Sequence, residues 1–198
     1  MTGKIVIATG NSGKINDFKA VFKEYEVVGI KTLLPDFEVE ETAGTFSGNA
    51  VLKSEAASKA LGLPVISDDS GLSVDGLDGA PGIYSARYAG EDATDADNNA
   101  KLLEEMSGVS DRKAHFTCVI ALSIPGEETR TYTGILDGEI LEEPRGTEGF
   151  GYDPLFKTDD GIFLGMINSK EKGEISHRSK ALKKLMDDGE VFEKLTSN

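Results

Sequence analysis

The chain has 198 residues, of which 38% are hydrophobic and 28% charged, and its formal net charge is −14. This length fits one domain or two tightly joined lobes, and the composition is that of an ordinary soluble globular protein. An acidic chain repels a nucleic-acid backbone, so we expect no nucleic-acid partner. The single cysteine, Cys118, excludes an internal disulfide framework and favours a reducing, cytoplasmic setting. The first apolar run is too short for a membrane span, so we expect no membrane partner.

The N-terminal segment predicts a strand, a glycine-rich turn and a helix. Residues 4–8 are apolar and β-branched, and apolar residues at helical spacing follow from Ile15 onward. The turn at residues 9–14 resembles a phosphate cradle, because amides at a helix N-terminus bind anions and Lys14 adds a full charge. It is not a Walker A loop, because only two residues separate its glycines and Ile15 follows the lysine. Taken alone, the residues leave a structural turn and a phosphate site equally open.

Residues 25–62 predict a short strand, an acidic loop and a helix. The strand is expected over residues 25–31, and the acidic loop over residues 33–42 is usually a solvated face. The helix is expected over residues 45–61, with Gly62 at its C-terminal cap. Lys53 lies inside this helix, where a lysine is most often on the solvent side.

Two adjacent carboxylates stand in the stretch Ser67-Asp68-Asp69-Ser70-Gly71-Leu72, directly after an apolar run. A buried strand that ends in acids and then turns can hold carboxylates at the rim of a pocket. Adjacent carboxylates repel each other, and a divalent metal is the usual compensation. Because Asp, Ser and Gly are also turn residues, a solvated turn is the alternative, and this stretch by itself favours the turn.

The middle of the chain predicts a capped helix followed by strands. Thr94 and Asp97 predict a capping box at the start of the helix. Residues 114–124 predict a strand. Residues 129–136 alternate and then meet Asp137-Gly138, so this segment either pairs as a hairpin-like neighbour or runs on through a turn.

The C-terminal third contains a second glycine-rich loop, at residues 146–154, and a last helix. Phe150 is flanked by glycines and can lie flat against a base, although a core position is the slightly favoured alternative. Residues 162–167 predict a short strand. His177 and Arg178 stand at the start of the helix against its dipole, as expected at a site that awaits an anion or a polar ligand. The predicted packing face of this helix is Ala181, Leu182, Leu185 and Met186.

Strands and helices mix along the chain, which predicts a mixed α/β sheet with helices on its faces. The phosphate-cradle turn, the acidic stretches, the aromatic loop and the C-terminal cations need one explanation. A nucleoside triphosphate requires all four, because phosphates need amides and lysines, and a bridging Mg²⁺ needs carboxylates. Its base needs an aromatic face, and water that attacks a phosphate needs a general base.

The sequence resembles the family of inosine/xanthosine triphosphate pyrophosphatases, which hydrolyse deaminated purine nucleotides. The motifs that carry the resemblance run in family order over nearly the whole chain. They are Ala8-Thr9-Gly10-Asn11 with Gly13-Lys14; Glu40-Glu41-Thr42 with Thr45-Phe46; Asn49-Ala50 with Leu52-Lys53; Asp68-Asp69-Ser70-Gly71-Leu72; Gly79 to Tyr88; Gly149-Phe150-Gly151-Tyr152-Asp153-Pro154; and Ile175-Ser176-His177-Arg178.

This resemblance implies hydrolysis of ITP, dITP and XTP to the monophosphate and pyrophosphate, with Mg²⁺ as cofactor. It also implies one domain over residues 1–198, an elongated mixed sheet with flanking helices, two lobes with the active-site cleft between them, and a homodimer. A stretch at residues 163–167 departs from the family pattern, which leaves the conformation before Lys172 open.

The resemblance further implies a role for each matched residue. Asp69 is the catalytic base, and Glu41 and Asp69 organise Mg²⁺; whether Asp68 or Asp69 touches the metal directly stays open. Phe150 stacks on the base, and Lys172, His177 and Arg178 surround the purine edge. The implied substrate-binding residues are Thr9, Gly10, Asn11, Ser12, Gly13, Lys14, Lys53, Ser70, Phe150, Gly151, Tyr152, Asp153, Lys172, His177 and Arg178.

Two alternatives are weighed against this interpretation. A sister family acts on pyrimidine or modified nucleotides, but the Ser176-His177-Arg178 motif and the loop at residues 149–153 argue against it. The other alternative is a nucleotide-binding sensor without turnover. The presence of Asp69, Glu41 and Lys53 argues against a sensor, because a protein that only binds needs no base.

Overall fold

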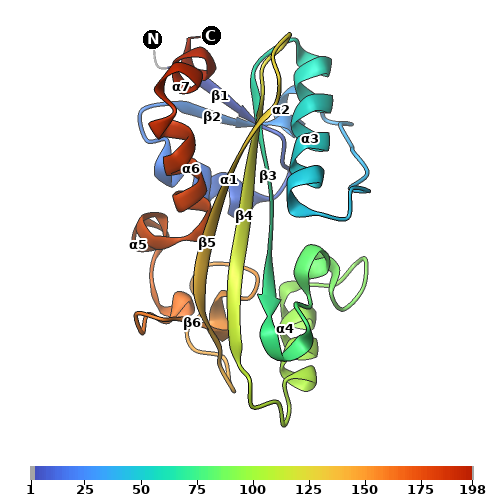
Figure 1. The fold of residues 1–198 in the computed structure, drawn as a ribbon, viewed down its shortest axis with the longest axis vertical. Coiled ribbons are helices and arrows are strands. Elements are labelled where there is room, and N and C mark those ends of the chain that lie inside the picture. The colour runs from blue at the N-terminus through green and yellow to red at the C-terminus, as the bar shows by residue number, and fades with distance from the viewer. Residues whose placement is uncertain (1–2, 198) are drawn as a thin grey trace. The chain divides into compact units, whose positions relative to one another are not determined.

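The computed structural model describes residues 3–197. Strands β1 and β2 pair parallel, as do β1 and β3, whereas β5 and β6 pair antiparallel. This confirms the predicted mixed α/β sheet with flanking helices (Figure 1). The sheet order is β2-β1-β3-β4-β5-β6, with β1 Lys4–Ile7, β2 Glu26–Gly29, β3 Val65–Val74, β4 Lys113–Ser123, β5 Arg130–Ile140 and β6 Phe156–Thr158.

Seven α-helices are assigned among the described residues, and local signals fix several of their ends. The Thr45 side chain accepts from the Gly48 amide at the start of one helix, and Gly62 ends it with φ 66°. Thr94 and Asp97 form the predicted capping box. The helices are α1 Ser12–Val21, α2 Ile30–Leu33, α3 Phe46–Leu61, α4 Asp95–Glu105, α5 Ser169–Ile175, α6 His177–Asp187 and α7 Gly189–Thr196. Among the described residues, none of these helices is long and apolar enough to cross a membrane.

The chain divides into two compact units. Unit 1 is formed by Met1–Asp69, Cys118–Gly134 and His177–Asn198, and unit 2 by Ser70–Thr117 and Ile135–Ser176. Each unit contains hydrophobic core clusters of its own. The single functional domain over residues 1–198 stays a prediction.

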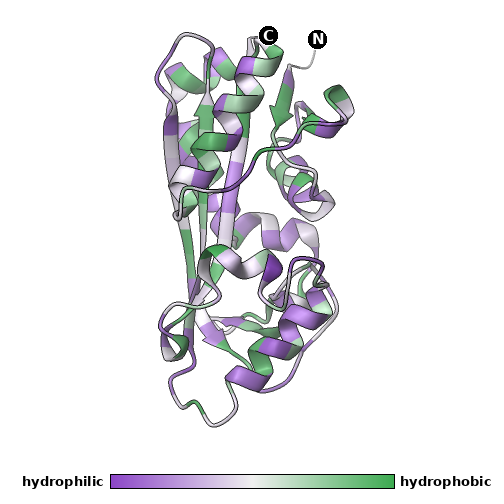
Figure 2. Cartoon of the chain, turned by 90° about the vertical axis from the view of Figure 1, so that its right-hand side faces the viewer, coloured by the Kyte–Doolittle hydropathy of each residue, from purple (hydrophilic) through white to green (hydrophobic). Residues whose placement is uncertain are grey.

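In unit 1 helices cover both faces of the sheet. Successive side chains of a strand point to opposite faces, so neighbouring residues of one strand belong to different cores. Ile66 of β3 and Ile120 of β4 belong to a core with α1, α6 and α7. Val65, the neighbour of Ile66, packs instead with residues of α2 and α3, and Val119 packs with α3. Figure 1 shows α6 and α7 on one side of these strands and α3 on the other. Along the helices hydrophobic and hydrophilic residues alternate, as expected of helices that bury one face (Figure 2).

One alternative and one predicted element are wrong. The segment at residues 129–136 lies beside β4, as the hairpin-like alternative predicted, but the chain does not turn at Asp137-Gly138: β5 continues to Ile140, and Gly138 pairs with Thr158 of β6. A Cβ on Gly138 would lie 2.7 Å from the Phe156 ring, so the glycine serves close packing against β6 rather than a turn. Residues 162–167 are not a strand: a single bridge joins Phe163 to Lys157, and a 3₁₀ turn follows at Leu164–Met166.

Two smaller corrections concern helices. The strand predicted to reach residue 31 ends at Gly29, because α2 begins at Ile30. Met186 does not belong to the buried face of α6, since it is 38% exposed, whereas Leu182 and Leu185 are fully buried. Leu182 and Leu185 lie three residues apart and define the buried stripe, and Met186 lies at its edge.

Candidate functional site

The acidic stretch is not a turn. Strand β3 continues through it to Val74, and Asp68 is fully buried while Asp69 is 6% exposed. A strand sends adjacent side chains to opposite faces of the sheet. The two carboxylates therefore lie on opposite faces of the sheet, and each interacts with different cations.

Asp68 lies on the face covered by α1 and α6. Its Oδ2 accepts from the Arg178 guanidinium at 2.8 and 3.2 Å, and the Lys14 ammonium lies 3.1 Å away. Arg178 also donates to Asp17 at 2.5 Å. Burial by itself would raise the pKa of Asp68, but Lys14 and Arg178 outweigh it and hold this pKa well below its ordinary value. Asp68 is therefore a fully buried carboxylate that is ionised at neutral pH.

Asp69 lies on the face covered by α3. The Asn49 amide donates to its Oδ2 at 3.3 Å, and the Lys53 ammonium lies 3.9 Å from its Oδ1. The same ammonium donates to Glu41 at 2.5 Å. Burial raises the pKa of Asp69 despite the opposing charge of Lys53, which makes Asp69 the more basic of the two neighbours.

Lys53 is thus not on the solvent side of its helix, because its side chain is only 13% exposed. Burial would lower the pKa of its ammonium, but the surrounding carboxylates outweigh burial and raise that pKa. Lys53 keeps its charge at every physiological pH. We call Lys14, Glu41, Lys53, Asp68 and Asp69 the carboxylate–lysine cluster of unit 1.

The glycine-rich turn before α1 is partly used by the fold itself. Asn11 is the N-cap of α1, and its side chain accepts from the Lys14 amide at 3.1 Å. The Thr9 hydroxyl accepts from the Asn11 amide at 3.2 Å. Gly10, Asn11 and Ser12 are exposed. The turn therefore has a structural role and also presents an accessible helix N-terminus beside Lys14.

At the start of α6, nearby carboxylates compensate the unfavourable position of a cation at the helix N-terminus. His177 is 6% exposed and Arg178 is 1% exposed. Asp68 and Asp17 balance the charge of the Arg178 guanidinium, and these ion pairs offset the unfavourable helix dipole. A charge that looks misplaced in the sequence is paired across 110 residues of chain.

In unit 2, Phe150 is held by an acid and a lysine. The Asp153 carboxylate accepts from the Phe150 amide at 3.0 Å and from the Lys172 ammonium at 2.5 Å. That ammonium also lies over the Phe150 ring, 4.3 Å from its centroid. Phe150 is half-buried, so it is neither a core residue nor a fully exposed one. We call Phe150, Asp153 and Lys172 the aromatic cluster.

Two neighbours of this cluster have structural roles. Tyr152 is buried in the core of unit 2, and its hydroxyl donates to the Ser85 carbonyl at 2.6 Å. Gly149 has φ 78°, and a Cβ there would collide with the Asp153 carboxylate, so no other residue fits. The glycines of this loop thus permit the close approach of Asp153 to the backbone of Phe150.

The predicted site residues fall into two groups. Unit 1 holds the turn at residues 9–14 together with Glu41, Lys53, Asp69, His177 and Arg178; unit 2 holds Ser70, residues 150–153 and Lys172. The trio predicted at the purine edge is therefore divided, with Lys172 beside Phe150 and Arg178 beside Asp68. That role of the trio stays a prediction.

Two residues that contact the site were missed in the sequence. Asp17 bonds Arg178, and Asn49 bonds Asp69. Each lies on the same helix as a predicted lysine, Asp17 three residues after Lys14 and Asn49 four residues before Lys53. Helical spacing places such pairs on one side, and this signal could have found them.

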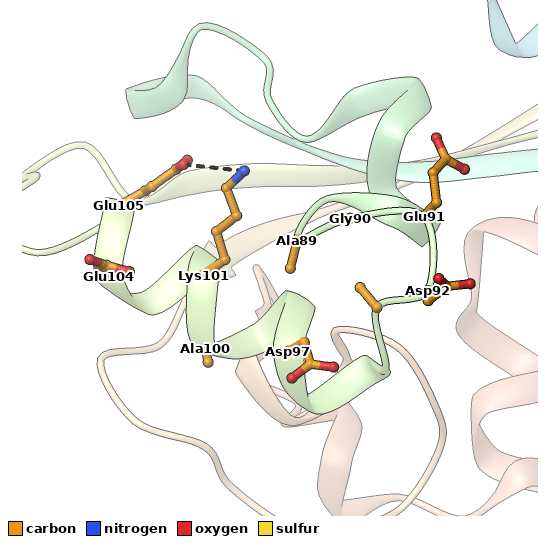
Figure 3. Close-up of a pocket in the computed structure, with 10 residues that line it drawn as sticks. Ala89, Gly90, Glu91, Asp92, Asp97, Ala100, Lys101, Glu104 and Glu105 are labelled. Carbon is orange, nitrogen blue, oxygen red and sulfur yellow. Dashed lines mark ion pairs between the residues drawn. The ribbon is translucent and has the colours of Figure 1, made fainter.

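A separate hollow in unit 2 has a volume of about 1000 Å³ (Figure 3). Its lining is strongly acidic, and Lys101 is the one cation among the residues that line it. The carboxylates are Glu91, Asp92, Asp97, Glu104 and Glu105. This hollow would repel a triphosphate, so it is not a candidate for phosphate binding.

The fold and the two clusters define a mixed α/β protein with the acids, lysines and aromatic group that nucleotide hydrolysis uses. The chain belongs to the Ham1 family, whose model matches residues 5–188.

Named relatives and solved structures agree with this assignment. A dITP/XTP pyrophosphatase of Staphylococcus aureus strain MW2 is 53% identical, over 90% of this chain and 92% of its own. The structure of the Staphylococcus aureus Ham1 protein is 51% identical with a TM-score of 0.85, over 94% of this chain and 98% of that one. A HAM1 protein from Coxiella burnetii is 40% identical with a TM-score of 0.83, over 95% and 98% of the two chains.

Proposed function

We propose that this protein hydrolyses the non-standard purine nucleoside triphosphates ITP, dITP and XTP to the monophosphate and pyrophosphate. The observation that carries the proposal is the surroundings of Asp69. A buried carboxylate of raised pKa stands 3.9 Å from Lys53, which is itself paired with Glu41. The name of the Staphylococcus aureus relative, a dITP/XTP pyrophosphatase, supports the choice of substrate.

Asp69 acts as the general base that takes a proton from the attacking water. Its carboxylate is almost fully buried on the face covered by α3, beside Lys53 and apart from Asp68, as suits a base that acts at one defined position. The Asn49 amide keeps the other oxygen of Asp69 in place. Asp68 does not share the role, because Lys14 and Arg178 stabilise its charge and make it a poor base.

Lys14 and Lys53 supply the positive charge for the phosphates. Both ammonium groups are paired with carboxylates, Lys14 with Asp68 and Lys53 with Glu41. The accessible turn at residues 10–12 adds backbone amides near the start of α1. A triphosphate that binds here meets charges that are already fixed in position.

The donor set fits Mg²⁺. Glu41 and Asp69 are two carboxylates around one ammonium, and such oxygen ligands, together with phosphates, are what Mg²⁺ prefers. Glu41 and Asp69 would hold the ion. When bound, Mg²⁺ neutralises charge that develops on the phosphates.

The aromatic cluster receives the base. Phe150 offers a face for stacking, and the Lys172 ammonium lies over the same ring. Hypoxanthine and xanthine carry an oxygen at position six where adenine carries an amine. A cationic donor favours the oxygen, so Lys172 favours the deaminated bases.

The test is a substrate panel of ITP, XTP, dITP, GTP and ATP with Mg²⁺, in which pyrophosphate and phosphate are measured separately. Pyrophosphate release from the deaminated substrates is expected. Release of single phosphate would contradict the cleavage position. Binding of ITP without any release would favour the nucleotide sensor instead.

We also propose that the protein is a cytoplasmic homodimer, as the family resemblance implies. The chain has a single cysteine, Cys118, and therefore no internal disulfide framework, which supports a reducing compartment. Sedimentation of the purified protein tests the dimer, and a monomer at micromolar concentration would contradict it.

A further inference from the structure

Helix α4 contacts the loop that carries Phe150 through two side chains. The Asp95 carboxylate accepts from the Gly151 amide at 2.7 Å. The Asn99 side-chain amide donates to the Gly151 carbonyl at 3.0 Å. Asp95 and Asn99 lie four residues apart on α4, so they emerge from the same side of the helix. Together they bind both polar groups of one residue, directly after Phe150.

The helix that supplies these side chains is itself well anchored. Its N-terminus is closed by the capping box of Thr94 and Asp97. The Asn98 side chain accepts from the Ala89 amide at 2.8 Å and donates to the Ala86 carbonyl at 3.1 Å. On its inner face, Leu102 is fully buried in the core of unit 2. Helix α4 is therefore a fixed support for the loop.

The loop needs such support, because Gly151 has φ 62° and lacks a side chain to hold it. On the other side of Phe150, the Asp153 carboxylate already fixes the Phe150 amide. With Gly151 bound by α4, both peptide groups that flank the Phe150 side chain are restrained. The backbone then fixes the direction in which the Phe150 side chain leaves the chain, and the Lys172 ammonium over the ring restrains its orientation further.

We propose that Asp95 and Asn99 are positioning residues that hold the Phe150 ring in the orientation in which it stacks on the substrate base. This inference rests on the proposed function, in which Phe150 receives the base. Neither residue touches the substrate. Their loss weakens nucleotide binding and leaves the chemical step at Asp69 unchanged.

The first test separates KM from kcat. Asp95→Ala and Asn99→Ala should each raise KM for ITP about fivefold, as expected for the loss of one hydrogen bond, with kcat unchanged. Asp95→Asn keeps an oxygen acceptor and should restore most of the affinity. Glu104→Ala is the matched control, because Glu104 is an exposed carboxylate of the same helix outside the capping box, and KM should stay the same. Equal effects of Glu104→Ala and Asp95→Ala would reduce Asp95 to a general effect of charge on the helix and overturn the proposal.

A double-mutant cycle then asks whether Asp95 acts through Phe150. In a Phe150→Ala background the positioned ring is absent, so Asp95→Ala should have no further effect on KM. A full fivefold effect in that background would contradict the proposal.

Failure of the proposed function can be distinguished from failure of the positioning role. If the unmodified protein binds ITP without hydrolysing it, the same variants are compared by calorimetry, and Kd should rise about fivefold in place of KM. Binding that is unchanged in Asp95→Ala overturns the positioning role whether or not turnover occurs.

Discussion

The two clusters organise charge in different ways. In the carboxylate–lysine cluster, adjacent acids on β3 are separated by the alternation of the strand, and each is compensated on its own face of the sheet. In the aromatic cluster one carboxylate, Asp153, serves both the Phe150 backbone and Lys172. In the first cluster Lys14, Lys53, Asp68 and Asp69 stand on helices and a strand and only Glu41 lies in a loop, whereas the second cluster depends on a glycine loop. Since regular elements hold side chains more rigidly than loops, we expect unit 1 to control turnover and unit 2 to control affinity.

The largest effect should follow from Asp69→Asn. This change removes the base but keeps the shape and the contact to Asn49, so kcat for ITP should fall by about 10²–10⁴ while binding persists. Steady-state kinetics and calorimetric binding of ITP check both halves. An unchanged kcat would remove Asp69 from the mechanism.

The neighbouring change, Asp68→Asn, should act on stability instead. It replaces the carboxylate that faces the buried Arg178 by a neutral amide, and breaking a buried ion pair costs about 3 kcal/mol. Urea unfolding of Asp68→Asn and Asp69→Asn side by side measures the difference. If Asp69→Asn is the more destabilising of the two, the contrast between the two faces of β3 is wrong.

Phe150→Ala tests the other cluster. Loss of stacking should weaken binding by about 1–3 kcal/mol, seen as a higher KM for ITP with little change in kcat. Tyr84→Ala is a suitable control, because Tyr84 is an aromatic of the same unit that is 56% exposed and outside the aromatic cluster. Should KM respond equally to both substitutions, Phe150 has no special role in base binding.

The smallest effect concerns Cys118, which is buried in the core of unit 1. Burial raises the pKa of the Cys118 thiol from 9.0 to about 12. Because the folded-state pKa is raised, the thiol stabilises the fold below pH 9.0 and loses this contribution as the pH rises toward about 12. Near pH 10.5 the loss is about 2 kcal/mol. Unfolding free energies measured against pH should therefore fall more steeply for the unmodified protein than for Cys118→Ala; parallel curves would contradict the prediction.

The sequence predicted helix ends correctly where only neighbouring residues determine them. The caps at Gly62 and Thr94 were both predicted, because a cap involves only residues within one turn of the helix end. The conformation at Asp137-Gly138 was left open between strand pairing and a turn, because it depends on β6, which lies about twenty residues further along the chain. Turn propensity is overridden there by strand pairing.

The candidate site shows the same division. The residue types and their order along the chain, from Lys14 to Arg178, were sufficient to predict a nucleotide triphosphate site, because each chemical task needs a particular side chain. The residue types alone did not separate Asp68 from Asp69; the family resemblance assigned the base to Asp69 and left open which of the two touches the metal. Only the tertiary structure shows that β3 continues through both acids and turns them to opposite faces, with Arg178 on one side and Lys53 on the other. Alternation follows once a segment is a strand, but a single sequence does not show that the strand continues through both acids or which helix covers which face.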